Sequence, residues 1–177
     1  MRENFSKAFE LTIGHEGGFQ NDPNDRGNWS TGIIGKGVNR GTKYGVSAMS
    51  YPTLDIKNLT VAQAEGIYKK DYWDRNSCDR LPLGVDYLVF DISVNHGVKD
   101  GAVFLQQAVG AKPDGDIGPS TLAMVARKNP QEIIEELCVV RAFDYISLGS
   151  FGRYGTGWFR RLMKTLTQAD DMLDKKG

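Results

Sequence analysis

The spacing of apolar residues is the feature that most restricts how this chain can fold. Beyond Thr60, apolar side chains recur every three or four positions through most of the sequence. This spacing is typical of amphipathic helices with one buried face. By contrast, residues 20–59 are rich in Gly, Asn, Asp and Pro, which favour turns. The sequence therefore predicts an all-α fold, dominated by helices, with one long loop segment and at most a small β-hairpin.

Local signals place the boundaries of the helices. Pro119 and Pro130 each suit the first position of a helix. The helix that begins at Pro130 is expected to pack through an apolar stripe that includes Phe143 and Ile146. A glycine-rich stretch at residues 149–157 predicts a break before the last helix. The predicted helices span, approximately, residues 5–16, 60–75, 84–96, 100–109, 119–128, 130–148 and 158–173.

The balance of charge excludes some functions. The chain has 177 residues, with 22 Lys and Arg against 22 Asp and Glu, and its formal net charge is zero. A neutral chain lacks the positive field of a nucleic-acid-binding protein, so we expect no nucleic-acid partner. Recognition of a polymer would have to depend on a shaped groove and not on long-range attraction.

Few side chains suit a metal ion. The chain has two His, and its two cysteines, Cys78 and Cys138, do not have the spacing of a metal site. Cys138 falls in an apolar helical stripe, which favours a small core residue, and a Cys78–Cys138 disulfide is the alternative. We therefore expect no metal and no cofactor.

No segment has the pattern of an export signal or of a membrane span. The first residues lack an uninterrupted apolar stretch, and no run approaches the roughly 18 apolar residues of a membrane helix. The sequence predicts synthesis in the cytoplasm without a signal peptide, and no membrane insertion. A substrate outside the cell would be reached only after release or export by another protein.

Glu16 is the main candidate for a catalytic acid. It closes the first predicted helix, whose apolar face begins with Phe5, and the sequence predicts that Gly17 and Gly18 end this helix. At about 100° per residue, Glu16 lies roughly 20° from Phe5 around the axis, on the apolar face. Desolvation there favours the protonated carboxyl, which is the form that a glycosidase uses on a leaving oxygen. The alternative is a helix-end Glu whose carboxylate reaches water.

An ordered set of motifs covers nearly the whole chain. The motifs are HEGGF with NDPND, then TKYGVS, YW, FDISVNHG, LQQA, DGDIGPSTL and GWFRR. Together they resemble the glycoside hydrolase family 108 endolysins, which are N-acetylmuramidases of phages and prophages, some of them known as secretion activators. The resemblance implies an α-helical, lysozyme-like fold and hydrolysis of the β-1,4 bond between N-acetylmuramic acid and N-acetylglucosamine. It also places the catalytic Glu in the EGG motif, which here is Glu16.

The resemblance further implies an organisation and a set of partners. We expect one lysozyme-like domain over residues 1–177, with a catalytic half at 1–91 and a helical, peptidoglycan-binding half at 92–177. The expected partner is the glycan strand of peptidoglycan, degraded at the periplasmic cell wall by a monomer. A holin or secretion machinery would provide the release or export.

The family pattern does not fix the second catalytic group. The usual Asp-Pro-Gly-Gly-x-Thr is replaced here by Asp25-Arg26-Gly27-Asn28 and an extended segment before Thr42. Because glycoside hydrolysis generally uses two carboxyl groups, we favour Asp25 as the charged stabiliser or water activator, with Asp22 as a substrate-binding neighbour. Turn formation is the alternative for both. Thr42 is a candidate for holding the nucleophilic water, and its alternative is a residue that starts a strand.

The remaining candidates bind substrate. Tyr44 is expected to stack on a sugar ring, or else to pack in a hairpin. Tyr72 and Trp73 line the cleft, or else belong to the core. Asn95 binds an N-acetyl group, or else caps a helix. Gln106 contacts sugar or is solvated.

Two other functions remain open. The DGDIGPSTL segment is consistent with a protein that binds peptidoglycan, or assists secretion, without cutting glycan. A lytic transglycosylase is the third hypothesis, because such an enzyme uses one Glu and no water-activating Asp.

Overall fold

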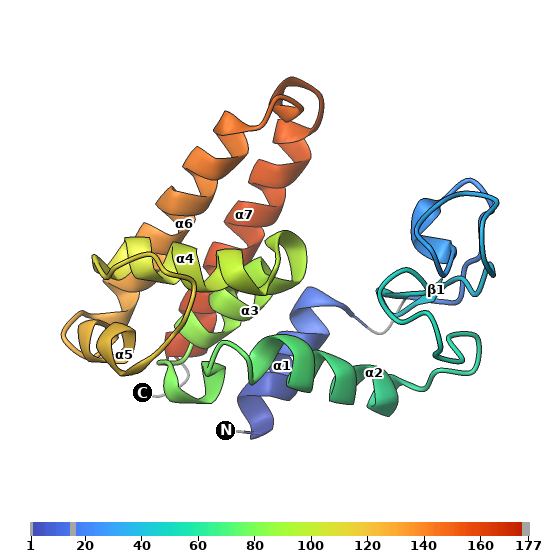
Figure 1. Ribbon diagram of the computed structural model, residues 1–177. Coiled ribbons are helices and arrows are strands. Elements are labelled where there is room, and N and C mark those ends of the chain that lie inside the picture. Colours follow the sequence, from blue (N-terminus) through green and yellow to red (C-terminus); the bar gives the residue numbers. More distant parts are fainter. Residues whose placement is uncertain (1, 15–16, 175–177) are drawn as a thin grey trace. The chain divides into compact units, whose positions relative to one another are not determined.

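The computed structural model describes residues 2–14 and 17–174 (Figure 1). Within them are seven α-helices and one two-stranded antiparallel sheet, so the predicted α-dominated class is confirmed. The helices are α1 (Arg2–Thr12), α2 (Val61–Tyr68), α3 (Val85–His96), α4 (Val98–Val109), α5 (Pro119–Val125), α6 (Pro130–Ser147) and α7 (Phe151–Asp174). The strands are β1 (Thr42–Lys43) and β2 (Val46–Ser47).

The chain divides into two compact units. One, the loop unit, contains Ser6–Lys69. The other, the helical unit, contains Met1–Phe5 together with Lys70–Gly177. The predicted assignment of catalysis to residues 1–91 and of wall binding to 92–177 stays a prediction.

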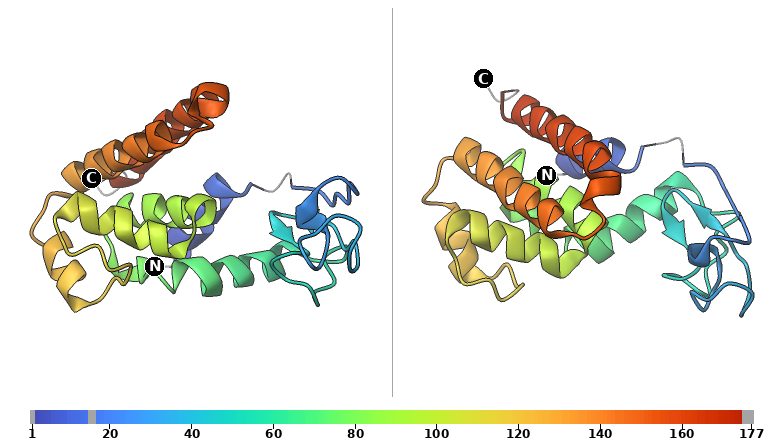
Figure 2. Two further views of the ribbon diagram at one scale, coloured as in Figure 1. Left: turned by 45° about the horizontal axis from the view of Figure 1, so that its top comes forward. Right: turned by 90° about the horizontal axis from the view of Figure 1, so that it is seen from above.

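The core of the helical unit is built around α3. Nine of its residues, from Val85 to Ser93, are buried, because α4, α6 and α7 all pack against it. Helices α6 and α7 run side by side as a hairpin across α3 and α4 (Figure 2). An ion-pair triad joins three of these helices: buried Asp91 of α3 accepts from Arg141 of α6 at 2.7 Å and from Arg161 of α7 at 2.6 Å. Such a pair specifies how helices meet more than it adds net stability.

Two predictions about the C-terminal hairpin are wrong. Helix α7 begins at Phe151, seven positions before the predicted start, so three glycines lie inside it. Each glycine costs a helix about 1 kcal/mol, which packing against α6 outweighs. At one of them, Gly155, a Cβ would lie 2.6 Å from the Phe151 ring. Phe143 and Ile146 are not packed but 69% and 53% exposed, because the buried face of α6 passes through Arg141 and Tyr145 instead.

The loop unit is built on a hairpin, on α2 and on the part of α1 that follows Phe5. Phe9 of α1 and Tyr68 of α2 pack edge to face, with ring centroids 5.5 Å apart. Between β1 and β2, Tyr44 (φ 51°) and Gly45 (φ 74°) both adopt the left-handed conformation, as in a type I′ turn. The Tyr68 hydroxyl donates to the Tyr44 carbonyl at 3.2 Å, and a Cβ at residue 45 would collide with it.

The predicted end of the first helix is also wrong. Helix α1 stops at Thr12, because Gly14 takes a left-handed conformation (φ 70°) while its N–H still bonds to the Glu10 carbonyl. The predicted position of Glu16 on the apolar face required a helix that continues through residue 16, so α1 does not support that position. Glu16 itself lies outside the described residues.

Candidate active site

The loop unit brings together polar side chains from three separate segments. Gln20 and Thr42 form an antiparallel bridge, in which each backbone N–H bonds to the other residue's carbonyl at 2.9 and 2.8 Å. The Asn28 carbonyl accepts from the N–H groups of Arg40 and Gly41, at 2.9 and 3.2 Å. These backbone contacts hold the side chains of Gln20, Asn28 and Thr42 next to one another.

Asn28 is the centre of this group. It is fully buried, and its amide uses all of its hydrogen-bonding capacity. Its Nδ2 donates to Gln20 Oε1 at 2.7 Å and to the Asp22 carbonyl at 3.0 Å. Its Oδ1 accepts from Thr42 Oγ1 at 2.7 Å and from Gln20 Nε2 at 3.1 Å. Asn28 and Gln20 were not among the predicted site residues, because their importance depends on a contact with Thr42 that no local pattern encodes.

Asp25 and Asp22 both form turns, as their alternative interpretation held. Asp25 caps the short 3-10 helix Arg26–Asn28, where its Oδ1 accepts from the Gly27 N–H at 2.8 Å. Its Oδ2 accepts from Gln20 Nε2 at 3.1 Å, which ties it to the cluster. Asp22 Oδ1 accepts from the Asn24 N–H at 2.9 Å. Both side chains are exposed, so turn formation leaves room for a role with substrate.

Gly17, which follows Glu16 in the sequence, is bound to the hairpin. Its carbonyl accepts from the Tyr44 N–H at 2.9 Å, and a Cβ on Gly17 would lie 3.0 Å from Tyr44 Cα. The backbones therefore meet too closely for a side chain there. The Tyr44 ring is partly exposed and lies 5.3 Å from Lys43 Nζ. Its predicted role in sugar stacking stays a prediction, as does the role of Thr42.

Of the two aromatic residues predicted to line the cleft or to belong to the core, Trp73 is buried, so its contact with sugar is wrong and its core alternative holds. Trp73 is 0% exposed and packs between Phe5 and Phe90, at centroid distances of 5.4 and 5.7 Å. Its indole N–H donates to Asp79 Oδ1 at 2.9 Å, so burial of the ring leaves this donor with a partner. Neighbouring Tyr72 is half-buried, and desolvation raises its pKa.

Gln106 is neither solvated nor available to sugar. It is buried and holds the loop between α4 and α5. Its Nε2 donates to Asp114 Oδ1 at 2.7 Å, to the Asp116 carbonyl at 2.9 Å and to Thr121 Oγ1 at 3.2 Å. Its Oε1 accepts from the Gly115 N–H at 2.9 Å. The predicted contact with sugar is wrong because the loop occupies both ends of the amide.

Asn95 bonds to its own helix. Its Nδ2 donates to the Asp91 carbonyl at 2.6 Å, four residues earlier in α3. The residue is exposed, and this contact corresponds to the structural alternative. Recognition of an N-acetyl group by Asn95 stays a prediction.

Asp86 has the raised pKa that was expected of Glu16, but its position does not suit catalysis. Burial raises its pKa to about 6, against the effect of hydrogen bonds from the Tyr87 N–H and from Asn4. The side chain is 1% exposed. A carboxyl without access to solvent cannot reach a polymer, so Asp86 is a structural residue at the start of α3.

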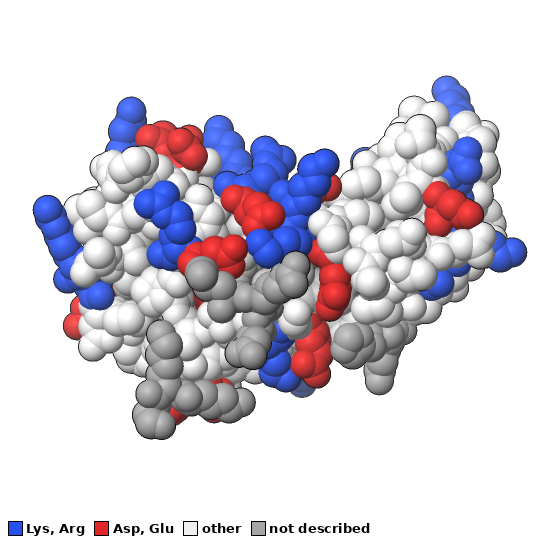
Figure 3. Space-filling view, turned by 90° about the horizontal axis from the view of Figure 1, so that it is seen from below, with Lys and Arg blue, Asp and Glu red and all other residues white. Residues whose placement is uncertain are grey.

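Metal and membrane features are absent from the part of the chain that the structure describes. There, no three His, Cys, Asp or Glu side chains gather in a way that would bind a metal ion. None of the described helices combines the length and the apolar character needed to cross a bilayer. Cys78 and Cys138 are both buried and form no disulfide with each other. Acidic and basic side chains are interspersed on the face shown in Figure 3.

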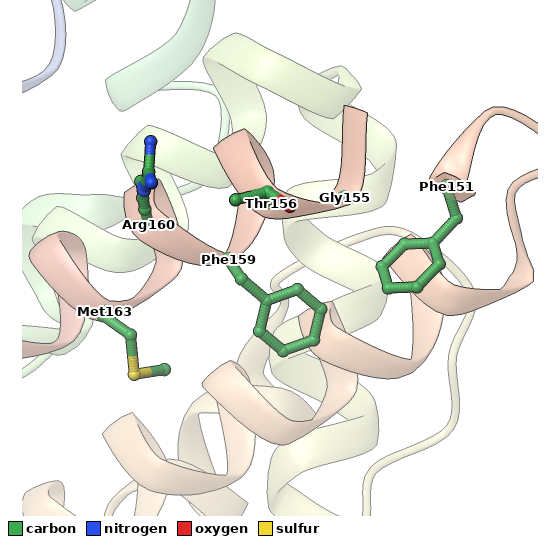
Figure 4. A pocket seen from close by; sticks show the side chains of 6 residues that line it. All are labelled: Phe151, Gly155, Thr156, Phe159, Arg160 and Met163. Carbon is green, nitrogen blue, oxygen red and sulfur yellow. The ribbon is translucent and has the colours of Figure 1, made fainter. Parts of the chain in front are cut away.

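A groove of about 580 Å³ runs along α7 (Figure 4). It is lined by Phe151, Gly155, Thr156, Phe159, Arg160 and Met163. The lining has no carboxyl group, so this groove lacks the acid and base that glycoside hydrolysis requires.

Comparisons with known proteins agree with the motifs. The model of the family described as glycosyl hydrolase 108 matches residues 9–97. Among solved structures, that of SagA from Brucella abortus is 30% identical in sequence, covers 98% of this chain and 97% of its own, and superimposes with a TM-score of 0.79. A search of curated proteins found no match.

Proposed function

The chain belongs to the glycosyl hydrolase 108 family, and from this premise we propose that it is an N-acetylmuramidase of the bacterial cell wall. The family supports a glycoside hydrolase whose substrate is peptidoglycan. The finer assignment, the β-1,4 bond between N-acetylmuramic acid and N-acetylglucosamine, rests on the motifs of the sequence.

The proposed reaction uses Glu16 as the general acid. Glu16 donates a proton to the glycosidic oxygen while the bond from that oxygen to the anomeric carbon breaks. A water molecule held by Thr42 forms the new bond to the anomeric carbon and gives its proton to the Asp25 carboxylate. Solvent then returns both carboxyl groups to their starting states.

Three side chains are proposed to hold the glycan. Asp22 and Tyr44 are exposed or partly exposed on the loop unit, beside the cluster of Gln20, Asn28 and Thr42. On the helical unit, Tyr72 offers a half-buried ring. Aromatic faces suit the C–H surfaces of pyranose rings, and carboxylates accept from sugar hydroxyls.

One observation carries the proposal beyond the family assignment. Asp25 and Thr42, which are 17 positions apart, are connected through only Gln20 and Asn28. The hydrogen bonds thus connect the proposed base with the residue proposed to hold the water. An Asp that served only to form the turn would not need hydrogen bonds that connect it to Thr42.

The decisive experiment replaces Glu16 by Gln and measures new reducing ends from purified sacculi. We expect a rate at least about 100-fold lower, because general acid catalysis typically contributes that much or more. Glu10→Gln is the matched control: Glu10 is exposed on α1 and forms an ion pair with Lys7 at 2.9 Å. Undiminished release by the Glu16 variant would refute the assignment.

The same digests separate the competing functions. Mass spectrometry of the products distinguishes hydrolysis, which leaves a reducing muramic acid, from transglycosylation, which leaves an anhydro sugar. Binding to sacculi without the release of new reducing ends would instead favour a non-catalytic wall-binding or secretion-helper protein. Action at the periplasmic wall follows from the proposed substrate, and the route of release stays a prediction.

A further inference from the structure

The orientation of the Asn28 amide is fixed by the backbone. Its Nδ2 lies 3.0 Å from the Asp22 carbonyl, a group that only accepts hydrogen bonds. The opposite end of the amide, Oδ1, must therefore face Thr42 Oγ1, at 2.7 Å. Because Asn28 is 0% exposed, water does not compete for either end.

The Gln20 amide is fixed in the same way. Its Oε1 accepts from the Asp22 N–H at 3.1 Å, a group that only donates. Its Nε2 must then face Asp25 Oδ2 and Asn28 Oδ1, both at 3.1 Å. The two backbone groups of Asp22 thus set the direction of every hydrogen bond in the cluster.

This direction decides what the Thr42 hydroxyl can do. A threonine hydroxyl has one proton, and Asn28 Oδ1 can only accept it. The remaining lone pairs of Thr42 Oγ1 are acceptors, and the side chain is half-exposed. A water molecule at Thr42 must therefore donate to it, which leaves the lone pairs of that water directed elsewhere.

We infer that Asn28 is a positioning residue for the nucleophilic water. Asn28 accepts the hydrogen bond of the Thr42 hydroxyl, so Thr42 can only accept a hydrogen bond from the water. The bound water therefore presents its oxygen to the anomeric carbon. Gln20 extends the same network to the Asp25 carboxylate, which receives the water's second proton. This inference rests on the proposed function, and it adds two residues, Asn28 and Gln20, that act through Thr42 and Asp25.

A double-mutant cycle on Asn28→Ala and Thr42→Val tests the inference, with kcat and KM measured on soluble peptidoglycan glycan strands. Asn28→Ala should lower kcat about 10- to 100-fold and leave KM nearly unchanged, because misplacement of a reacting group costs this much. In the Thr42→Val background the same change should alter kcat by no more than about 2-fold. Equal losses in both backgrounds would show a purely structural role and overturn the inference.

Two further variants keep the test independent of folding. Asn28→Asp retains an acceptor oxygen toward Thr42 but places its second oxygen against two other acceptors, Gln20 Oε1 and the Asp22 carbonyl. We expect it to lose stability while retaining most of the wild-type kcat, and a folded Asn28→Asp enzyme as impaired as Asn28→Ala would contradict the inference. Asn39→Ala is the matched control, because Asn39 also donates to a loop carbonyl, that of Asn21 at 3.2 Å. Full kcat in this variant is expected.

Failure of the inference and failure of the proposed function give different results. If Thr42→Val is impaired but Asn28→Ala is not, Asn28 is no positioning residue while hydrolysis stands. If the wild-type chain releases no reducing ends, the proposed function fails before Asn28 is tested.

Discussion

Gly41 shows how one residue determines the geometry of the candidate site. It lies between Asn28, which accepts its N–H, and Thr42, which follows it in β1. Its φ of 77° is a left-handed conformation, and a Cβ would collide with the Gln20 carbonyl oxygen. Glycine is therefore required both by the backbone angle and by the closeness of the neighbouring strand.

We expect Gly41→Ala to lower the free energy of unfolding by more than about 1 kcal/mol. It should also reduce glycan cleavage, because the shift needed to relieve the overlap separates Gln20 from Thr42. Thermal unfolding and reducing-end release measure the two effects. Gly18→Ala is the control, since a Cβ there meets nothing within 4 Å. Equal melting temperatures for the two variants would contradict this account.

The buried carboxyl of Asp86 should make stability depend on pH. Its pKa rises from 3.8 to about 6 on folding, so the folded state binds a proton more tightly than the unfolded state. The free energy of unfolding must then fall as pH rises from about 4 to 6, by at most about 3 kcal/mol.

Asp86→Asn tests this dependence. The amide stays neutral, so the variant should be more stable than wild type at pH 7 and should show a flatter profile between pH 4 and 6. Chemical denaturation at several pH values gives the comparison. Asp171→Asn, on the exposed side of α7, should leave the slope unchanged. If the Asp86→Asn variant keeps the wild-type dependence of unfolding free energy on pH, that dependence comes from other groups.

At the scale of elements, Gln106 of α4 holds α5 and the loop that precedes it. The loop between α4 and α5 carries three groups that bond to its amide, and Thr121 of α5 provides a fourth. Because the side chain is buried, removal of the amide leaves these groups without their partner inside the protein.

We expect Gln106→Met, which keeps the volume, to destabilise the fold by about 1–3 kcal/mol. Amide hydrogen exchange at residues 114–121 should become faster, since the loop loses its anchor. Gln107→Met is a close control, because Gln107 is exposed on the next position of α4. Unchanged exchange at 114–121 in the Gln106 variant would show that the loop is held by other contacts.

At the scale of the whole molecule, charge gives little long-range attraction. The 22 basic and 22 acidic residues cancel, and both signs are mixed on the surface in Figure 3. Some charges are used inside the helical unit, where Asp91 joins α3 to α6 and α7. We therefore expect the proposed glycan recognition to depend on local contacts such as those of the loop unit.

Much of the fold was predictable because its signals are local. Pro119 and Pro130 begin α5 and α6 as expected, and the apolar segment after residue 84 forms the buried α3. These features depend on residues within one or two helical turns. The errors at Gly14 and Phe151 concern helix ends, where a glycine either stops a helix or is tolerated by packing from another helix.

The sequence by itself determined the helical class, the position of the long loop and the family, because periodicity, turn residues and motif order are written along the chain. The tertiary structure decided which polar side chains meet. Asn28 and Thr42 are 14 positions apart and bond only because the loop folds back. The sequence leaves Trp73 open between the cleft and the core, and it predicts a Gln106 that is solvated or contacts sugar; only the packing of distant segments shows both residues buried. Burial and hydrogen-bond partners depend on the whole chain, since each partner comes from a segment that local pattern does not bring near.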